Sequence, residues 1–215
     1  MTPVIKLSVR GLAKYMTSSP SAQRRVLREY KYPDEDEPAA MRLYYKDASD
    51  RILAYHSNAH DRAWLRTKAA ELAELARLTP GPAGTRLRHN ARAVSAYEAG
   101  FGDRNFDVNR PLRLRHEVGN VRVTVSPELH VLEDGKAKIV KLDFSKEPPP
   151  TEYIKIVSQV MYEAARGHLA GLTSSSVLYL DVARATEHRG ARAGSRTLRD
   201  IDAACASIEA IWPTI

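Results

Sequence analysis

Cysteine is almost absent from this chain of 215 residues, which contains only Cys205. A single cysteine cannot form an internal disulfide, and the surrounding DIDAACASIEAIW predicts an apolar helix that buries the thiol. The chain also lacks a run of about 18 apolar residues, which a membrane helix would need. Its first residues, MTPVIKLSVRGLAKYM, have neither the apolar centre nor the cleavage site of a signal peptide. We therefore expect a soluble, cytoplasmic protein with no membrane partner.

Several common catalytic patterns are missing as well. RGARAGSR has too few correctly spaced glycines for a dinucleotide or P-loop fingerprint. Ser174 to Ser176 precede a predicted strand without the Gly-x-Ser-x-Gly turn of a hydrolase. His56 and His60 have the spacing of a metal pair, but Asn58 and Asp61 predict a loop between them. These absences argue against nucleotide-binding, serine-hydrolase and histidine-metal sites.

What the chain does have is an excess of basic residues. It carries 33 Lys and Arg against 26 Asp and Glu, which gives a net charge of +7 and favours a polyanionic partner. Arginine predominates in two segments, and its guanidinium group suits bidentate phosphate binding. We predict phosphate contacts from Arg86, Arg88, Arg92, Arg184, Arg189, Arg192 and Arg196.

The first half of the chain is predicted to be helical. Ser19 before Pro20 is typical of a helix start, and Asp61 is placed to cap a helix with an apolar line of leucines and alanines. Proline and glycine in TPGPAGT predict a loop over residues 79–85. The predicted helices span residues 20–30, 38–56, 62–78 and 86–99.

The second half changes to the two-residue period of strands. Three strands with tight connections are predicted at 112–118, 121–131 and 136–145, followed by a helix from Thr151, a buried strand at 174–183 and a C-terminal helix at 197–212. We expect a helical region over residues 1–80 that packs on an α/β core over residues 81–215.

The strand KIVKLDFSK, residues 138–146, contains an unexpected lysine. In an extended chain Val140, Leu142 and Phe144 share one face, and Ile139, Lys141 and Asp143 share the other. Two interpretations are open: Lys141 is solvated on an exposed face, or it is functional.

The order helix, strand, strand, strand, helix, strand over residues 86–183 resembles the core of the PD-(D/E)XK, or restriction-endonuclease-like, superfamily. The resemblance implies an acid on the second strand, an acid-x-lysine on the third, and a divalent metal, Mg²⁺ or Mn²⁺, that activates water. Glu128 matches the first acid and Lys141, thirteen positions later, matches the lysine. Ile139 occupies the other acid position, so the pattern is degenerate unless Asp143 supplies that carboxylate in inverted order.

Three functions follow as hypotheses. The leading one is a nucleic-acid-binding protein of restriction-endonuclease-like fold with a degenerate metal site, with DNA favoured over RNA. The second is an active metal-dependent nuclease in which Glu128 and Asp143 bind the metal and Lys141 positions water. The third is a non-catalytic subunit whose helical first half docks to a protein complex.

Overall fold

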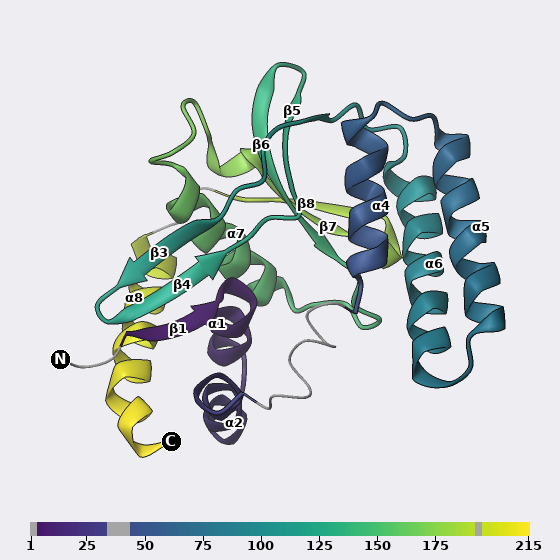
Figure 1. Cartoon of the computed structure of the whole chain (residues 1–215). Helices are drawn as coiled ribbons and strands as arrows, with labels where there is room; N and C mark the ends of the chain where they lie inside the picture. Colours follow the sequence, from purple (N-terminus) through teal and green to yellow (C-terminus); the bar gives the residue numbers. More distant parts are fainter. Residues whose placement is uncertain (1–3, 34–43, 192–194) are drawn as a thin grey trace.

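The computed structural model describes residues 4–33, 44–191 and 195–215. It has a mixed α/β fold, in which the described residues form two mixed sheets and seven α-helices (Figure 1). None of these helices is long and apolar enough to cross a membrane. The strands are β1 (Ile5–Ser8), β2 (Asp107–Val108), β3 (Leu114–Val118), β4 (Val121–Val125), β5 (Leu129–Glu133), β6 (Lys136–Asp143), β7 (Val177–Asp181) and β8 (Thr186–Arg189). The helices are α1 (Val9–Met16), α2 (Pro20–Lys31), α4 (Lys46–Ser57), α5 (Arg62–Leu78), α6 (Gly81–Phe101), α7 (Thr151–Ala165) and α8 (Ser195–Ile211).

The larger sheet has the strand order β2-β5-β6-β7-β8. β5 and β6 form an antiparallel hairpin whose turn places Asp134 and Gly135 at φ values of 52° and 70°, as the EDG motif predicts. α7 then connects β6 to β7, which lies parallel to it. The predicted hairpin, helix and buried strand are therefore present, and the parallel pairing of β7 with β6 was not predicted.

The two faces of β6 differ as its alternation predicts. Val140, Leu142 and Phe144 pack in a cluster with α4, α5 and α6, whereas Ile139 packs in a second cluster with α1, α7 and the smaller sheet. Lys141 lies on the same face as Ile139 and is only 6% exposed. The interpretation of Lys141 as a solvated surface lysine is therefore wrong.

The smaller sheet has the order β1-β4-β3 and was only partly predicted. The single strand expected over residues 121–131 is in fact two strands, because the chain leaves β4 at Ser126 and Pro127 and enters the other sheet as β5. Proline lacks the amide that a continuous ladder would need. β1 was not predicted at all, and it pairs in parallel with β4.

The helix predictions differ in accuracy. Asp61 caps α5 by accepting a hydrogen bond from the Trp64 amide at 2.9 Å, as expected. The loop predicted over residues 79–85 is wrong, because α6 begins at Gly81 and Pro82 lies in its first turn, where a missing amide breaks no helical hydrogen bond. The helix predicted over 38–56 lies partly outside the described residues, and α4 accounts for its second half.

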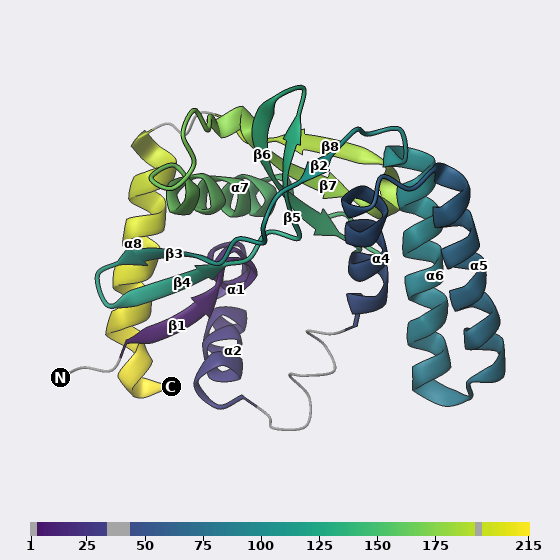
Figure 2. The ribbon, with the colours of Figure 1, turned by 45° about the horizontal axis from the view of Figure 1, so that its top comes forward.

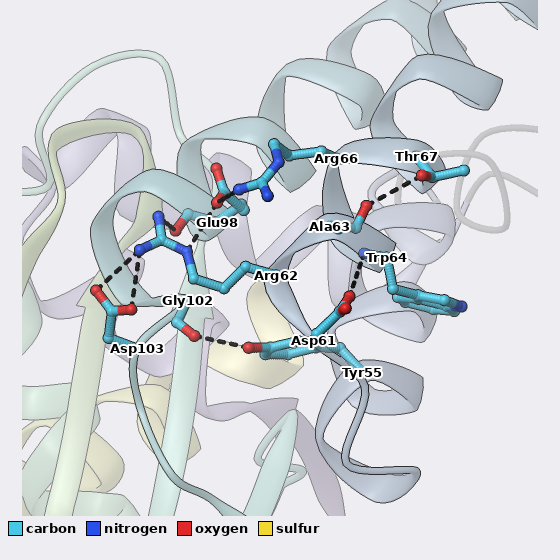
Figure 3. A network of polar contacts seen from close by, with 10 residues as sticks. All are labelled: Tyr55, Asp61, Arg62, Ala63, Trp64, Arg66, Thr67, Glu98, Gly102 and Asp103. Carbon is cyan, nitrogen blue, oxygen red and sulfur yellow. Dashed lines mark hydrogen bonds and ion pairs between the residues drawn. The ribbon is translucent and has the colours of Figure 1, made fainter.

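α5 and α6 form an antiparallel hairpin, and the domain boundary predicted between residues 80 and 81 falls in their connection. A polar network fastens the open end of this hairpin (Figure 3). Arg62 on α5 donates to Glu98 Oε1 on α6 at 2.8 Å and to Asp103 Oδ1 at 2.8 Å. Arg66 donates to the same Glu98 oxygen at 2.8 Å.

We expect Glu98→Gln to destabilise the protein by about 2 kcal/mol, because the buried carboxylate accepts charge-assisted bonds from two arginines. Asp103→Asn is the matched control: its side chain is 83% exposed, so its ion pair with Arg62 should contribute less than about 1 kcal/mol. Urea denaturation measures both. Equal losses in the two variants would contradict the assignment of Glu98 as the centre of the network.

Candidate functional site

Two of the predicted catalytic residues, Glu128 and Asp143, line one pocket of about 240 Å³, and the third, Lys141, is bonded to Glu128. Glu128 follows β4 and Asp143 ends β6, and both contribute to the wall. Lys141 reaches the same place from the middle of β6. The remaining lining residues come from α1, from α4 with the residue before it, and from the end of β6: Arg10, Tyr45, Lys46, Ser49, Phe144 and Ser145.

Lys141 and Glu128 form a largely buried ion pair. The Lys141 Nζ atom is 2.7 Å from Glu128 Oε1, and the side chains are 8% and 20% exposed. The second carboxylate oxygen, Oε2, accepts a hydrogen bond from the Leu142 amide at 2.9 Å. Lys141 also donates to the Ser126 carbonyl at 3.3 Å. Both oxygens of Glu128 are therefore engaged by the protein itself.

The electrostatic environment lowers the pKa of Lys141 below its ordinary value. Burial is the main cause and the positive charge of Arg10 adds to it, whereas Glu128 and Asp143 act in the opposite direction. Glu128 holds the Lys141 side chain in place, but the buried ammonium group loses its proton more readily than that of a lysine in water.

Arg10 completes the charged cluster and was not predicted. It lies in the first turn of α1, its Nη2 atom donates to the Leu142 carbonyl at 2.7 Å, and the same atom lies 3.9 Å from Glu128 Oε1. The parallel pairing of β1 with β4 brings it there, because Arg10 follows the end of β1 and Glu128 follows the end of β4. Nothing local in the sequence reveals this pairing.

The two oxygens of Asp143 differ in their hydrogen bonds. Its Oδ1 atom accepts hydrogen bonds from the Ser145 hydroxyl at 2.7 Å and the Ser145 amide at 3.3 Å. Its Oδ2 atom is buried and has no hydrogen bond of ordinary geometry among the described residues, although the Tyr179 side chain interacts with this carboxylate. Burial is the main cause that raises the pKa of Tyr179 above its ordinary value, and the negative charge of Asp143 and its interaction with the Tyr179 side chain add to this effect. Burial with smaller charge effects raises the pKa of Tyr153 to about 12.

These residues fit a divalent cation poorly. Mg²⁺ and Mn²⁺ need several oxygen ligands, whereas Asp143 Oδ2 is the one carboxylate oxygen at this pocket without a hydrogen bond of ordinary geometry among the described residues. Ile139, at the position of the missing acid, is fully buried in the apolar core. Glu128 and Asp143 are also balanced by Lys141 and Arg10, so little net negative charge attracts a metal. No group of three metal-ligating side chains occurs in the described part of the chain.

The arginines predicted to contact phosphate do not form one surface. Arg184 is bound to Asp181 at 2.8 Å and to the Ser145 carbonyl at 3.4 Å, and Arg189 is bound to Glu187 at 2.5 Å. Arg192 lies outside the described residues. Arg196 is 91% exposed on α8 and lies 3.9 Å from Asp200. Arg184 therefore links the end of β7 to the loop after β6, whereas Arg189 is 65% exposed and pairs within its own strand.

The other three predicted arginines lie on α6. Arg88 and Arg92 are exposed and line a groove of about 520 Å³ between α5 and α6, whereas the Nε atom of Arg86 is buried. α6 and α8 lie at opposite ends of the molecule in both views (Figures 1 and 2). A single short nucleic acid would therefore not contact the arginines of α6 and Arg196 of α8 as one continuous surface.

Comparison of the sequence with protein-family models and with curated proteins found no match.

Proposed function

We propose that this protein binds nucleic acid through a restriction-endonuclease-like core whose metal site is degenerate. The observation that carries the proposal is the ion pair between Lys141 and Glu128, which joins two residues of the expected catalytic set while Ile139 replaces the third. The pair satisfies both oxygens of Glu128 internally, and the Asp143 oxygen that makes no hydrogen bond of ordinary geometry is buried.

The arrangement of elements supports the restriction-endonuclease-like interpretation. The β5–β6 hairpin, α7 and β7 agree with the second half of the order that the resemblance implies. The first half differs, because five strands rather than three separate α6 from α7, and two of them, β3 and β4, pair in the smaller sheet. Fold likeness alone does not define an activity, so the function has to rest on the site. At this site the cationic groups are held in place, but the ligands for a catalytic metal are incomplete.

The charge of the chain supports a polyanionic ligand. A net charge of +7 favours nucleic acid through phosphate contacts and counterion release, and this affinity falls steeply with salt. The pocket itself is close to neutral, because Arg10 and Lys141 balance Glu128 and Asp143. The excess positive charge therefore lies on other surfaces. This distribution is expected of a protein that binds nucleic acid there, and not of a protein that binds a divalent cation in the pocket.

The test is a gel-shift and nicking assay with supercoiled plasmid at low salt. Purified protein is added with Mg²⁺, Mn²⁺ or EDTA, and each sample is run before and after removal of the protein. We expect retardation without nicking, equal in EDTA and in metal, and equal for Lys141→Met. Lys155→Met, at an exposed helix position, is the control for loss of one lysine.

Two outcomes would overturn the proposal. Nicking that requires metal and is lost in Lys141→Met, but not in Lys155→Met, would establish an active nuclease. Neither retardation nor nicking would leave a non-catalytic interaction subunit as the better interpretation.

A further inference from the structure

The outward face of the smaller sheet carries an unusual set of side chains. Because side chains alternate along a strand, Ile5, Leu7 and the β4 valines point inward and their neighbours point outward. The outward residues other than Ser8, which caps α1, are Lys6, Arg115, Glu117, Arg122 and Thr124, and we call them the basic face. It contains no apolar side chain.

The strand register places the cations of the basic face next to one another. Lys6 is the Cα partner of Arg122, and Arg115 is the partner of Thr124, one step further along the same face. Like charges directly opposite each other on a sheet are destabilising. Arg122 is relieved by Glu117, whose Oε1 accepts from its Nε at 2.6 Å, but Lys6 and Arg115 have no acidic partner among the described residues.

The basic face is open to solvent. Lys6, Arg115 and Thr124 are all exposed. The helices that pack on this sheet contact its other side, where Ile201 and Ile208 of α8 join the cluster that contains Val121 and Val123. Figure 1 shows α8 behind the three strands of this sheet. An anion can therefore approach the cations of this face directly.

Two strands of the basic face lead to residues of the pocket. β1 and β4 run in the same direction, and Arg10 lies two residues beyond the end of β1 while Glu128 lies three residues beyond the end of β4. Both strands therefore run from the basic face to the pocket wall. A chain of phosphates that lies along these strands would meet Arg10 at the end of its path.

We propose that the basic face is the principal nucleic-acid contact surface, and that it directs the phosphate backbone toward the Arg10 side of the pocket. This inference rests on the proposed function and names the surface that performs it. Lysine, arginine and hydroxyl side chains without apolar neighbours suit phosphate contacts, whereas a protein partner would gain little here because protein interfaces depend on buried aromatic and apolar anchors.

The test compares two double charge reversals. Lys6→Glu with Arg115→Glu alters the basic face, and Arg88→Glu with Arg92→Glu alters the exposed arginines of α6. Each variant lowers the net charge from +7 to +3, so the general electrostatic attraction changes equally. Binding of a fluorescein-labelled DNA duplex, the matching single strand and an RNA duplex is measured by anisotropy over a series of salt concentrations.

We expect the basic-face variant to bind at least about tenfold more weakly and the slope of log K against log salt to become shallower by about 2, while the α6 variant changes much less. Stronger weakening in the α6 variant, or equal weakening in both, would overturn the inference but leave the proposed function standing. Failure of the unaltered protein to bind any of the three probes would remove both.

Thermal unfolding shows whether the Lys6→Glu and Arg115→Glu double variant is still folded when its binding is measured. Both altered positions of the basic face are exposed, and Glu at position 6 would lie opposite Arg122, so thermal unfolding should stay close to that of the unaltered protein. If the double variant is unstable, Lys6→Ala and Arg115→Ala separately should each make the salt slope shallower by about 1. No change of slope in either single variant would count against the basic face.

Discussion

Glu128→Gln is expected to destabilise the protein by about 3 kcal/mol, because it leaves the ammonium group of Lys141 buried without its negative partner. The two groups are 2.7 Å apart and the lysine side chain is 8% exposed, so water cannot replace the lost carboxylate. Glutamine keeps the shape of the side chain and an oxygen for the Leu142 amide, which isolates the effect of charge. Urea denaturation at neutral pH measures the loss.

Lys141→Met is the informative comparison. It removes the buried charge, fills a similar volume, and leaves Glu128 with the Leu142 amide and with Arg10 nearby. We expect a smaller loss than for Glu128→Gln, since replacing a buried ion with an apolar group is often nearly neutral. The double variant should be more stable than the sum of the two single losses predicts. Strict additivity would show that the pair has no role in holding the site together.

The same experiment bears on function. If the pair is a remnant of a catalytic site and now serves structure, Lys141→Met should keep both its fold and its affinity for nucleic acid. Loss of affinity in a stable Lys141→Met protein would instead show that the ammonium group contacts the ligand. Stability and binding measured on one set of variants therefore separate the two roles of Lys141.

Local sequence patterns predicted the centre of the site but not its surroundings. Glu128 and Lys141 are linked by one tight hairpin, so the EDG turn and the alternation of β6 were enough to place them together. Arg10 and Tyr179 reach the same region through a parallel strand pairing and a helical crossover. Those pairings depend on packing between segments that are distant in the sequence. The hydrophobic periodicity within one segment does not show which distant segment it pairs with.

The predicted phosphate contacts of the arginines failed for a different reason. A count of arginines does not reveal which of them are already bound within the protein. For Arg184 and Arg189 the signal was present, because Asp181 and Glu187 lie three and two residues before them. The basic face was missed because its cations come from three strands, one of which, β1, carried too short an alternation to be recognised.

His56 should make the protein sensitive to mild acid. His56 lies on α4 and is 8% exposed, and its Nε2 atom lies 2.7 Å from the Tyr97 hydroxyl. Burial, with a contribution from the positive charge of Arg104, lowers the pKa of His56 from 6.5 to about 4. The native protein therefore holds this imidazole neutral at pH values where the unfolded chain protonates it.

The direction of the effect follows from proton uptake. Between pH 6.5 and about 4 the unfolded state binds more protons at His56 than the native state, so the free energy of unfolding falls as the pH falls. The full contribution is about 3 kcal/mol, reached once the pH is below the native pKa. Well above pH 6.5 both states are neutral at this position and His56 adds no pH dependence.

His56→Gln should flatten the acid limb of the stability curve. We expect the unfolding free energy of this variant to change by about 3 kcal/mol less than that of the unaltered protein between pH 6.5 and 4, whatever its stability at neutral pH. His168→Gln, at an exposed position, is the matched control and should retain the original slope. If His56→Gln and His168→Gln have the same slope, the imidazole of His56 is protonated in the native state, and the apolar cluster around it must admit water or an acidic partner.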